Sequence, residues 1–120
     1  MNATIIYKAN VKSIVLDELA KELPVFIADV MAVPGGNVAL LKPEQVALEF
    51  SQASIRDVGS DIRITIFARS NDPRASTGND RAKAILEKAI ALITTSGEKC
   101  SVDIRLYLME IGAAAHLRDI

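Results

Sequence analysis

Segments in which apolar and polar residues alternate, set in order with two helical patterns, constrain the fold of this chain most. Alternation with a period of two is typical of strands that bury one face of a sheet. It occurs in residues 46–52, 62–68 and 102–109, and residues 3–9 form a further β-rich segment. Helical spacing covers residues 11–33 and about 79–95. The order β-α-β-β-α-β predicts an α+β two-layer fold of two β-α-β halves, with a four-stranded sheet and both helices on one face.

The first helical segment contains a proline, Pro24, near its middle. A proline inside a helix removes one backbone hydrogen bond and clashes with the preceding turn, so we expect a kink or two helices. Pro34-Gly35-Gly36 is typical of a helix end followed by a loop. The apolar positions expected to face the core are Ile14, Val15, Leu19, Val25, Phe26, Val30 and Val33.

The second half of the chain repeats the plan of the first. A turn at residues 57–61 separates the two middle strands, and it fits either a hairpin or a connection that crosses the sheet. Residues 70–78 are expected to be a polar loop, Ser96-Gly97 ends the second helix, and residues 112–120 form a tail. The expected core positions of the second helix are Ala82, Ile85, Leu86, Ala89, Ile90 and Ile93.

The chain is half apolar but contains almost no aromatic residues. Its 120 residues fit one domain spanning residues 1–120, and 50% are hydrophobic while 4% are aromatic. A domain of this size buries a limited share of its surface, so we expect some aliphatic surface to lie between subunits.

The sheet face away from the helices carries a mixture of polar and apolar side chains. Two interpretations remain open: burial against another subunit or a ligand, and an exposed face with scattered apolar groups. The residues concerned are Arg63, Thr65, Phe67, Arg105, Tyr107 and Met109.

Composition and motifs argue against several classes of function. The formal net charge of −1 argues against a nucleic-acid partner, which attracts basic proteins. The single cysteine, Cys100, suits a reducing compartment, and no apolar stretch approaches the ~20 residues of a membrane span. With no signal peptide visible, we expect a cytoplasmic protein without a membrane partner. His116 has no partner at ligand spacing, and no phosphate loop is present, so no metal or cofactor is expected.

Three short segments carry a resemblance to a known family. They are Lys42-Pro43-Glu44-Gln45-Val46-Ala47 at the entry to the second strand, Ser70-Asn71 after the third strand, and residues 102–115 (VDIRLYLMEIGAAA). With the order of elements, they resemble the tautomerase superfamily, which includes macrophage migration inhibitory factor and 5-carboxymethyl-2-hydroxymuconate isomerase. The resemblance covers nearly the whole chain by layout. It implies a homotrimer whose three sheets enclose a central barrel, with a pocket for a small carboxylic acid between neighbouring subunits.

The N-terminus departs from the pattern of that family. The family's catalytic group is an N-terminal proline, exposed when the initiator methionine is removed. This chain begins Met1-Asn2-Ala3, and because asparagine is large we expect Met1 to be retained. A primary amine with an ordinary pKa near ~7.7–8.0 can act as a base when it is buried. The Met1 amine is therefore the one catalytic candidate, in place of the proline.

Two basic residues are candidates for binding a carboxylate. Arg69 ends the third strand, just before a loop that also holds Arg74 and leads to a helix N-terminus, where anions are favoured. The planar guanidinium suits a carboxylate, although a surface ion pair with a nearby aspartate explains Arg69 equally well. Lys42 matches the family's pocket lysine through its Lys-Pro context, and its alternative is a solvated loop residue.

The last strand supplies two further candidates, Arg105 and Tyr107, on the second face of the sheet. By the resemblance, Arg105 and Asp103 occupy positions of polar pocket residues, and their alternative is an ion pair.

Two functions therefore stand as alternatives. One is a tautomerase-like protein, either a diverged isomerase or a binder of a small keto or enol acid. The other is a non-catalytic ferredoxin-like module that binds a ligand or a protein and is monomeric or dimeric.

Overall fold

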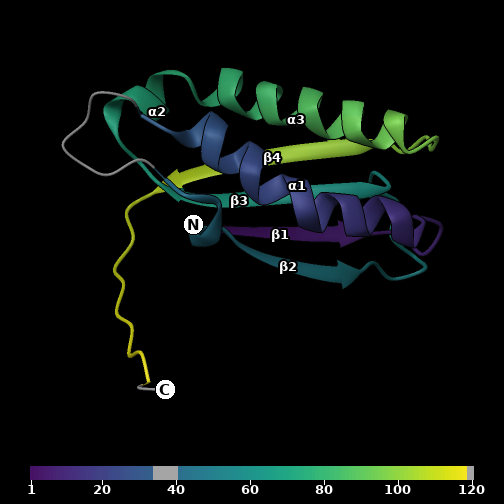
Figure 1. The fold of residues 1–120 in the computed structure, drawn as a ribbon, viewed down its shortest axis with the longest axis horizontal. Coiled ribbons are helices and arrows are strands. Elements are labelled where there is room, and N and C mark those ends of the chain that lie inside the picture. Colours follow the sequence, from purple (N-terminus) through teal and green to yellow (C-terminus); the bar gives the residue numbers. More distant parts are fainter. Residues whose placement is uncertain (34–40, 119–120) are drawn as a thin grey trace.

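The computed structural model describes residues 1–33 and 41–118 (Figure 1). The elements are β1 (Asn2–Tyr7), α1 (Ser13–Met31), the short 3₁₀ helix η1 (Pro43–Gln45), β2 (Ala47–Gln52), β3 (Ile62–Arg69), α2 (Asp72–Ser76), α3 (Gly78–Thr95) and β4 (Val102–Met109). The predicted β-α-β-β-α-β order is confirmed, with η1 and α2 added to it. The expected helix end at Pro34-Gly35-Gly36 and the last two residues of the tail lie outside the described residues.

The four strands form one mixed sheet in the order β2-β1-β3-β4. β1 pairs in parallel with β2 and antiparallel with β3, and β3 pairs in parallel with β4. Each parallel pair is joined by a helical crossover, as parallel pairing requires. Because β1 lies between β2 and β3, residues 53–61 cross the end of β1. The crossing connection is confirmed, and the hairpin alternative is wrong.

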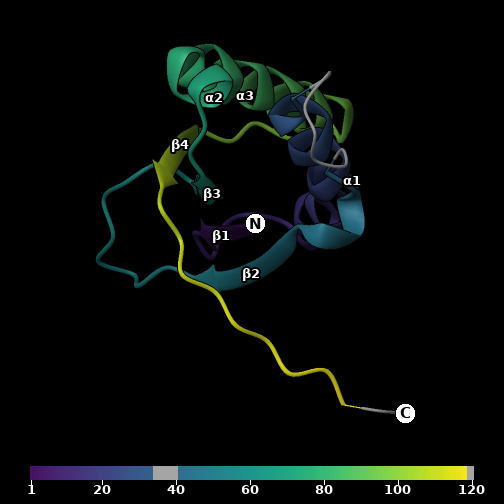
Figure 2. The same cartoon turned by 90° about the vertical axis from the view of Figure 1, so that its left-hand side faces the viewer.

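Helices α1 and α3 cover one face of the curved sheet and leave the other face open (Figures 1 and 2). Alternation along the strands places the core on the helix side: Ile62, Ile64 and Ile66 of β3 are almost fully buried, as is Ile5 of β1. The two-layer arrangement and the burial of one face of the strands expected from their alternation are therefore confirmed.

The first helix is continuous, with Pro24 inside it, so the expected division into two helices is wrong. Five of its six buried residues follow a spacing of four, namely Val15, Leu19, Leu23, Ile27 and Met31, and the sixth is Ala28. Two expected core residues are exposed, Ile14 by 52% and Val25 by 46%. Val25 lies two positions after Leu23, about 200° around the helix, which turns it away from the sheet.

The second half differs from the expectation in two places. Ile90 is 46% exposed, because the side of α3 that packs on the sheet is the row of Ile85, Ala89 and Ile93. The polar loop at residues 70–78 contains α2, where the Asn71 side chain accepts a hydrogen bond from the Arg74 backbone N–H at 2.9 Å. After α3, Gly97 adopts a positive φ of 80°, which ends the helix as predicted.

None of the helices in residues 1–33 and 41–118 combines the length and the apolar character that crossing a membrane requires.

Candidate functional site

The end of the sheet where β1 begins brings two of the predicted residues together through Gln45. The Met1 ammonium donates to the Gln45 carbonyl oxygen at 3.3 Å, and the Ala47 N–H donates to the Met1 carbonyl at 2.9 Å. The Lys42 N–H donates to the Gln45 side-chain oxygen at 2.8 Å. η1 therefore holds Lys42 and the Met1 amine in one corner, beside the start of β2.

Arg69 lies at the same end of the sheet. It is the last residue of β3, and Phe67 two positions earlier pairs with Asn2, the first residue of β1. Its exposed guanidinium donates to the Ile111 carbonyl at 3.4 Å. Within residues 1–33 and 41–118, no carboxylate lies within ion-pair distance of Arg69. The guanidinium therefore keeps donors free for an anion.

Tyr107 lies on the open face of the sheet, in the row of residues that starts at Asn2. Asn2 pairs with Phe67, and Phe67 pairs with Tyr107 across the β3–β4 ladder. The two aromatic rings stack with their centroids 5.3 Å apart and their planes 18° apart. They are 37% and 45% exposed, so this apolar patch stands open in a single copy of the chain.

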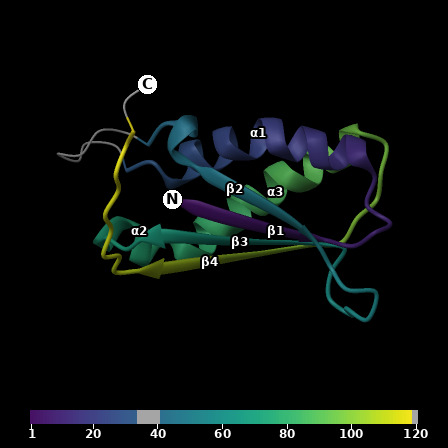
Figure 3. The same ribbon diagram turned by 90° about the horizontal axis from the view of Figure 1, so that it is seen from below.

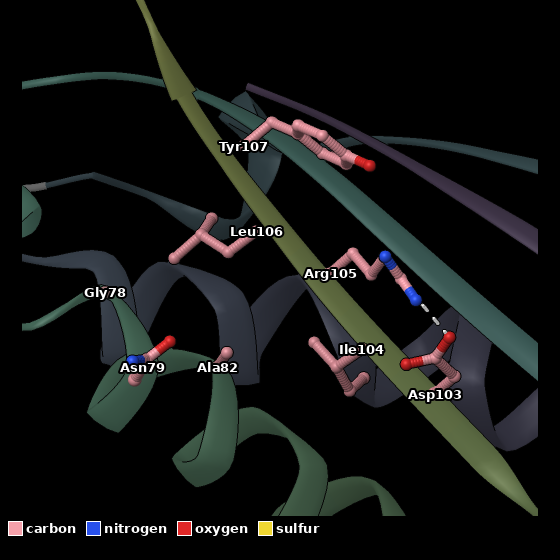
Figure 4. Close-up of a pocket in the computed structure, with 8 residues that line it drawn as sticks. All are labelled: Gly78, Asn79, Ala82, Asp103, Ile104, Arg105, Leu106 and Tyr107. Atoms are coloured by element: carbon pink, nitrogen blue, oxygen red, sulfur yellow. Dashed lines mark hydrogen bonds and ion pairs between the residues drawn. The ribbon is translucent and has the colours of Figure 1, made fainter.

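Arg105 lies further from Met1, near the middle of β4. It pairs with Thr65 of β3, and its Nε is 3.4 Å from Asp103 Oδ2 on the same strand (Figure 4). Both side chains are solvated, with the Arg105 side chain 66% exposed. An exposed pair of this kind stabilises a protein little, so Arg105 remains available to another partner.

The stacked aromatic pair lies between two hollows of about 430 Å³ each. One wraps around the outer edge of β4, where Arg105 and Tyr107 point to one side of the strand and Ile104 and Leu106 to the other (Figure 4). The second lies on the open face over β1 and β2 and is lined by Asn2, Ala3, Thr4, Ala47, Leu48, Glu49 and Phe67. The first hollow contains the predicted residues Arg105 and Tyr107, and neither hollow contains Met1, Lys42 or Arg69.

Arg74 and Arg81 stabilise the fold. The sequence did not indicate this role for either arginine. Arg74 donates to the Met31 carbonyl from Nε at 3.2 Å and from Nη2 at 3.1 Å, and its Nη1 donates to the Arg69 carbonyl at 2.9 Å. Arg81 donates to the carbonyls of Val30 and Ala32. Burial, followed by the nearby charge of Arg81, lowers the pKa of Arg74. Both arginines therefore satisfy the free carbonyls at the end of α1. No local sequence pattern marks a contact between residues so distant in the chain.

The remaining titratable candidates do not assemble into a second centre. Cys100 is half-buried just before β4, and burial, then Asp61 and Glu98, raise the pKa of its thiol. His116 is exposed in the extended tail. In the described parts of the chain, no three His, Cys, Asp or Glu side chains are grouped to hold a metal ion.

Several solved structures share the fold of this chain at low sequence identity. No protein-family model matches the chain, and no curated protein matches it. A symmetric trimer of fused 4-OT is 12% identical, with a TM-score of 0.67 over 98% of this chain and 94% of that one. N1, a member of the cis-3-chloroacrylic acid dehalogenase family, is 13% identical with a TM-score of 0.61, over 90% of this chain and 76% of N1. A malonate semialdehyde decarboxylase is 8% identical with a TM-score of 0.60, over 98% and 92%.

These neighbours are tautomerase-superfamily structures, so the resemblance in the sequence is confirmed at the level of the fold. At such low identity a shared fold says nothing of a shared activity, because unrelated functions occupy the same fold. Several neighbours are trimers of fused 4-OT.

Proposed function

We propose that this chain is a tautomerase-like protein that holds a small keto or enol carboxylic acid in a pocket completed between the subunits of a homotrimer. The observation that carries the proposal is the end of the sheet where β1 begins: the Met1 amine and Lys42 are both bonded to Gln45 there, and Arg69 ends the neighbouring strand without a carboxylate partner among the described residues. Three cationic groups at one end of the sheet favour an anion.

The incomplete pocket and the open sheet face support the trimer. The Phe67–Tyr107 stack and the hollows on either side of it are open in one copy. The trimers of fused 4-OT have the same fold. Packing three open faces around a central axis would bury these apolar side chains and bring Arg105 and Tyr107 of one copy towards the Met1 corner of the next.

We assign the residues distinct roles in this proposal. Arg69 binds the carboxylate with its planar fork, and Lys42 and Arg105 add positive charge. Tyr107 supplies an aromatic wall beside the bound acid. The Met1 amine in its neutral form is the candidate proton carrier: its nitrogen accepts a proton from the carbon beside the carbonyl and then gives it to the carbonyl oxygen, which converts the keto acid to its enol. If Met1 transfers no proton, the same pocket binds the acid without converting it.

The test has two parts, assembly and chemistry. Native mass spectrometry of the untagged protein is expected to give a trimer, and the denatured mass is expected to show that Met1 is retained. NMR in heavy water, with a panel of small 2-keto acids, measures loss of the α-proton. Exchange that stops when the terminal amine is acetylated supports an isomerase, and binding without exchange supports a binder.

A matched pair of variants tests the carboxylate site. Arg69→Gln removes the guanidinium and should weaken binding of the 2-keto acids about 10–100-fold, as expected for a hydrogen bond between charged groups. Arg118→Gln changes an exposed arginine of the tail and should leave binding unchanged. A monomeric or dimeric protein that binds none of the acids would contradict the proposal and favour the ferredoxin-like module instead.

A further inference from the structure

The connection between β2 and β3 presents two aliphatic side chains to solvent. Ile55 is 94% exposed and Val58 is 96% exposed. Isolated apolar residues are common on protein surfaces, whereas grouped ones favour contact with another surface, and these two lie on one projecting loop. The Arg56 side chain between them has no ion-pair partner among the described residues.

This loop, residues 53–61, is held in place by its own hydrogen bonds. The Asp57 carboxylate accepts from the Gly59 N–H at 2.7 Å and forms an ion pair with Arg63 on β3. A side chain at Gly59 would meet Asp57 Oδ1 at 3.1 Å and Arg63 Cδ at 3.2 Å, so the turn packs tightly against the pair. Ile55 and Val58 are therefore presented by a structured turn, and ordering it on binding costs little.

The loop lies at the Tyr7 end of β1 and projects away from the helices. The Ala53 N–H donates to the Tyr7 carbonyl at 2.7 Å, and the Lys8 N–H donates to the Asp61 carbonyl at 2.9 Å. Figures 2 and 3 show the loop on the open side of the sheet, extending past β4 and away from β2.

A small hollow occupies the opposite edge of the molecule at the same end. It has a volume of about 180 Å³ and lies between β2 and the first turns of α1. Tyr7, Leu16, Ala20 and Phe50 give it an apolar lining, and Asp17 adds one carboxylate. Within the part of the chain that the structure describes, Asp17 has no ion-pair partner.

We propose that residues 53–61 of one copy dock into this hollow on the next copy, with Ile55 and Val58 against its apolar lining and Arg56 facing Asp17. The chemistry of the two surfaces is complementary, since aliphatic side chains and a cation meet an apolar hollow and an anion. The loop projects beyond β4 while the hollow lies beside β2, so the contact is heterologous and closes into a ring when the rotation allows it. This inference rests on the homotrimer proposed above.

The first experiment compares exposed aliphatic residues inside and outside the loop. Ile55→Ser/Val58→Ser should raise the concentration at which half of the trimer dissociates by at least about tenfold, measured by sedimentation across a dilution series. Ile90→Ser, which changes an exposed aliphatic residue on the outer side of α3, should leave that concentration unchanged. Equal dissociation of the two variants would overturn the docking.

Charge reversal tests the polar contact. Arg56→Asp and Asp17→Arg should each weaken the trimer, and the variant carrying both should recover most of the loss. If the trimer of the combined variant dissociates as readily as that of the less stable single variant, the pairing of the loop with the hollow is overturned.

A cysteine pair tests the same contact directly. Ile55→Cys/Cys100→Ala is mixed with Ala20→Cys/Cys100→Ala under oxidising conditions, and a covalent dimer between the two proteins is expected. Its absence in a protein that remains a trimer would overturn the docking alone. A wild-type chain that is monomeric at every concentration would overturn both the docking and the pocket between subunits.

Discussion

The two arginines at the end of α1 lead to a quantitative prediction about stability. Arg74 donates twice to the Met31 carbonyl and once to the Arg69 carbonyl, and so joins α1 to the end of β3. Arg74→Ala leaves these carbonyls without that donor. A hydrogen bond from a charged group contributes about 1.5–3 kcal/mol, and a cation at a helix C-terminus adds about 0.3–1 kcal/mol.

The repulsion between Arg74 and Arg81 reduces this gain, because each guanidinium lies in the field of the other. We therefore expect Arg74→Ala to lower the free energy of unfolding by about 2 kcal/mol, which lowers Tm by roughly 6–10 °C in a domain of 120 residues. Arg74→Lys keeps the charge but lacks the planar fork that reaches two carbonyls. Its free energy of unfolding should lie between those of Arg74→Ala and the wild type.

Urea unfolding at a fixed protein concentration measures these differences, since assembly also contributes to stability. Arg118→Ala, in the exposed tail, is the control and should stay within about 0.5 kcal/mol of the wild type. The double variant Arg74→Ala/Arg81→Ala should lose more than the sum of the single losses, because each single variant also removes the repulsion between the two arginines and the double variant removes it only once. An Arg74→Ala protein as stable as the Arg118→Ala control would refute the role assigned to this pair.

Two further predictions follow from the start of β4. The Ser101 backbone N–H donates to the Asp61 carboxylate at 2.9 Å and lowers its pKa, so this contribution to stability is present above the unfolded pKa of about 3.9 and is lost as pH falls further. In urea titrations, the stability difference between wild type and Asp61→Asn should therefore be larger at pH 7 than at pH 3, and equal differences would contradict the assignment. Burial, with Asp61 and Glu98, raises the pKa of the Cys100 thiol, so a disulfide reagent at pH 8 should modify the folded protein several-fold more slowly than the urea-unfolded chain. Equal rates would show that the thiol is not protected by the fold.

The sequence predicted most of the fold because the strands bury one face. Residues 102–109 were predicted as a strand and form β4 with the same bounds, since alternation places Ile104, Leu106 and Leu108 on the helix side. The helix faces were predicted less well. Ile14 and Val25 are apolar but lie beside the buried row of α1, and helical spacing alone does not show which of two neighbouring rows meets the sheet.

The candidate site was predicted in part, because it depends on contacts between distant segments. The Lys-Pro context predicted Lys42 as a site residue. Its link to Met1 consists of hydrogen bonds that both residues donate to Gln45, and these form only when η1 is folded against β1. Arg69 and Arg74 are equivalent as sequence signals, since both are arginines near a helix start. The structure separates them: Arg74 is bonded to backbone carbonyls, whereas Arg69 makes a single long contact with Ile111. Such a difference is decided by packing, which no local pattern records.

The central place of β1 has a consequence for how the chain folds. β1 precedes the other three strands of this sheet in the sequence. Its residue Asn2 pairs with Ala47 of β2 and with Phe67 of β3, so both partners lie far from it along the chain. A contact between residues far apart in sequence loses the entropy of closing a long loop before its interactions stabilise the chain, and this slows folding. Until β2 and β3 have been synthesised, both edges of β1 are unpaired. Apolar residues such as Ile5 and Ile6 are then exposed. The sheet can therefore close only after β3 has been synthesised, since β3 pairs with both β1 and β4.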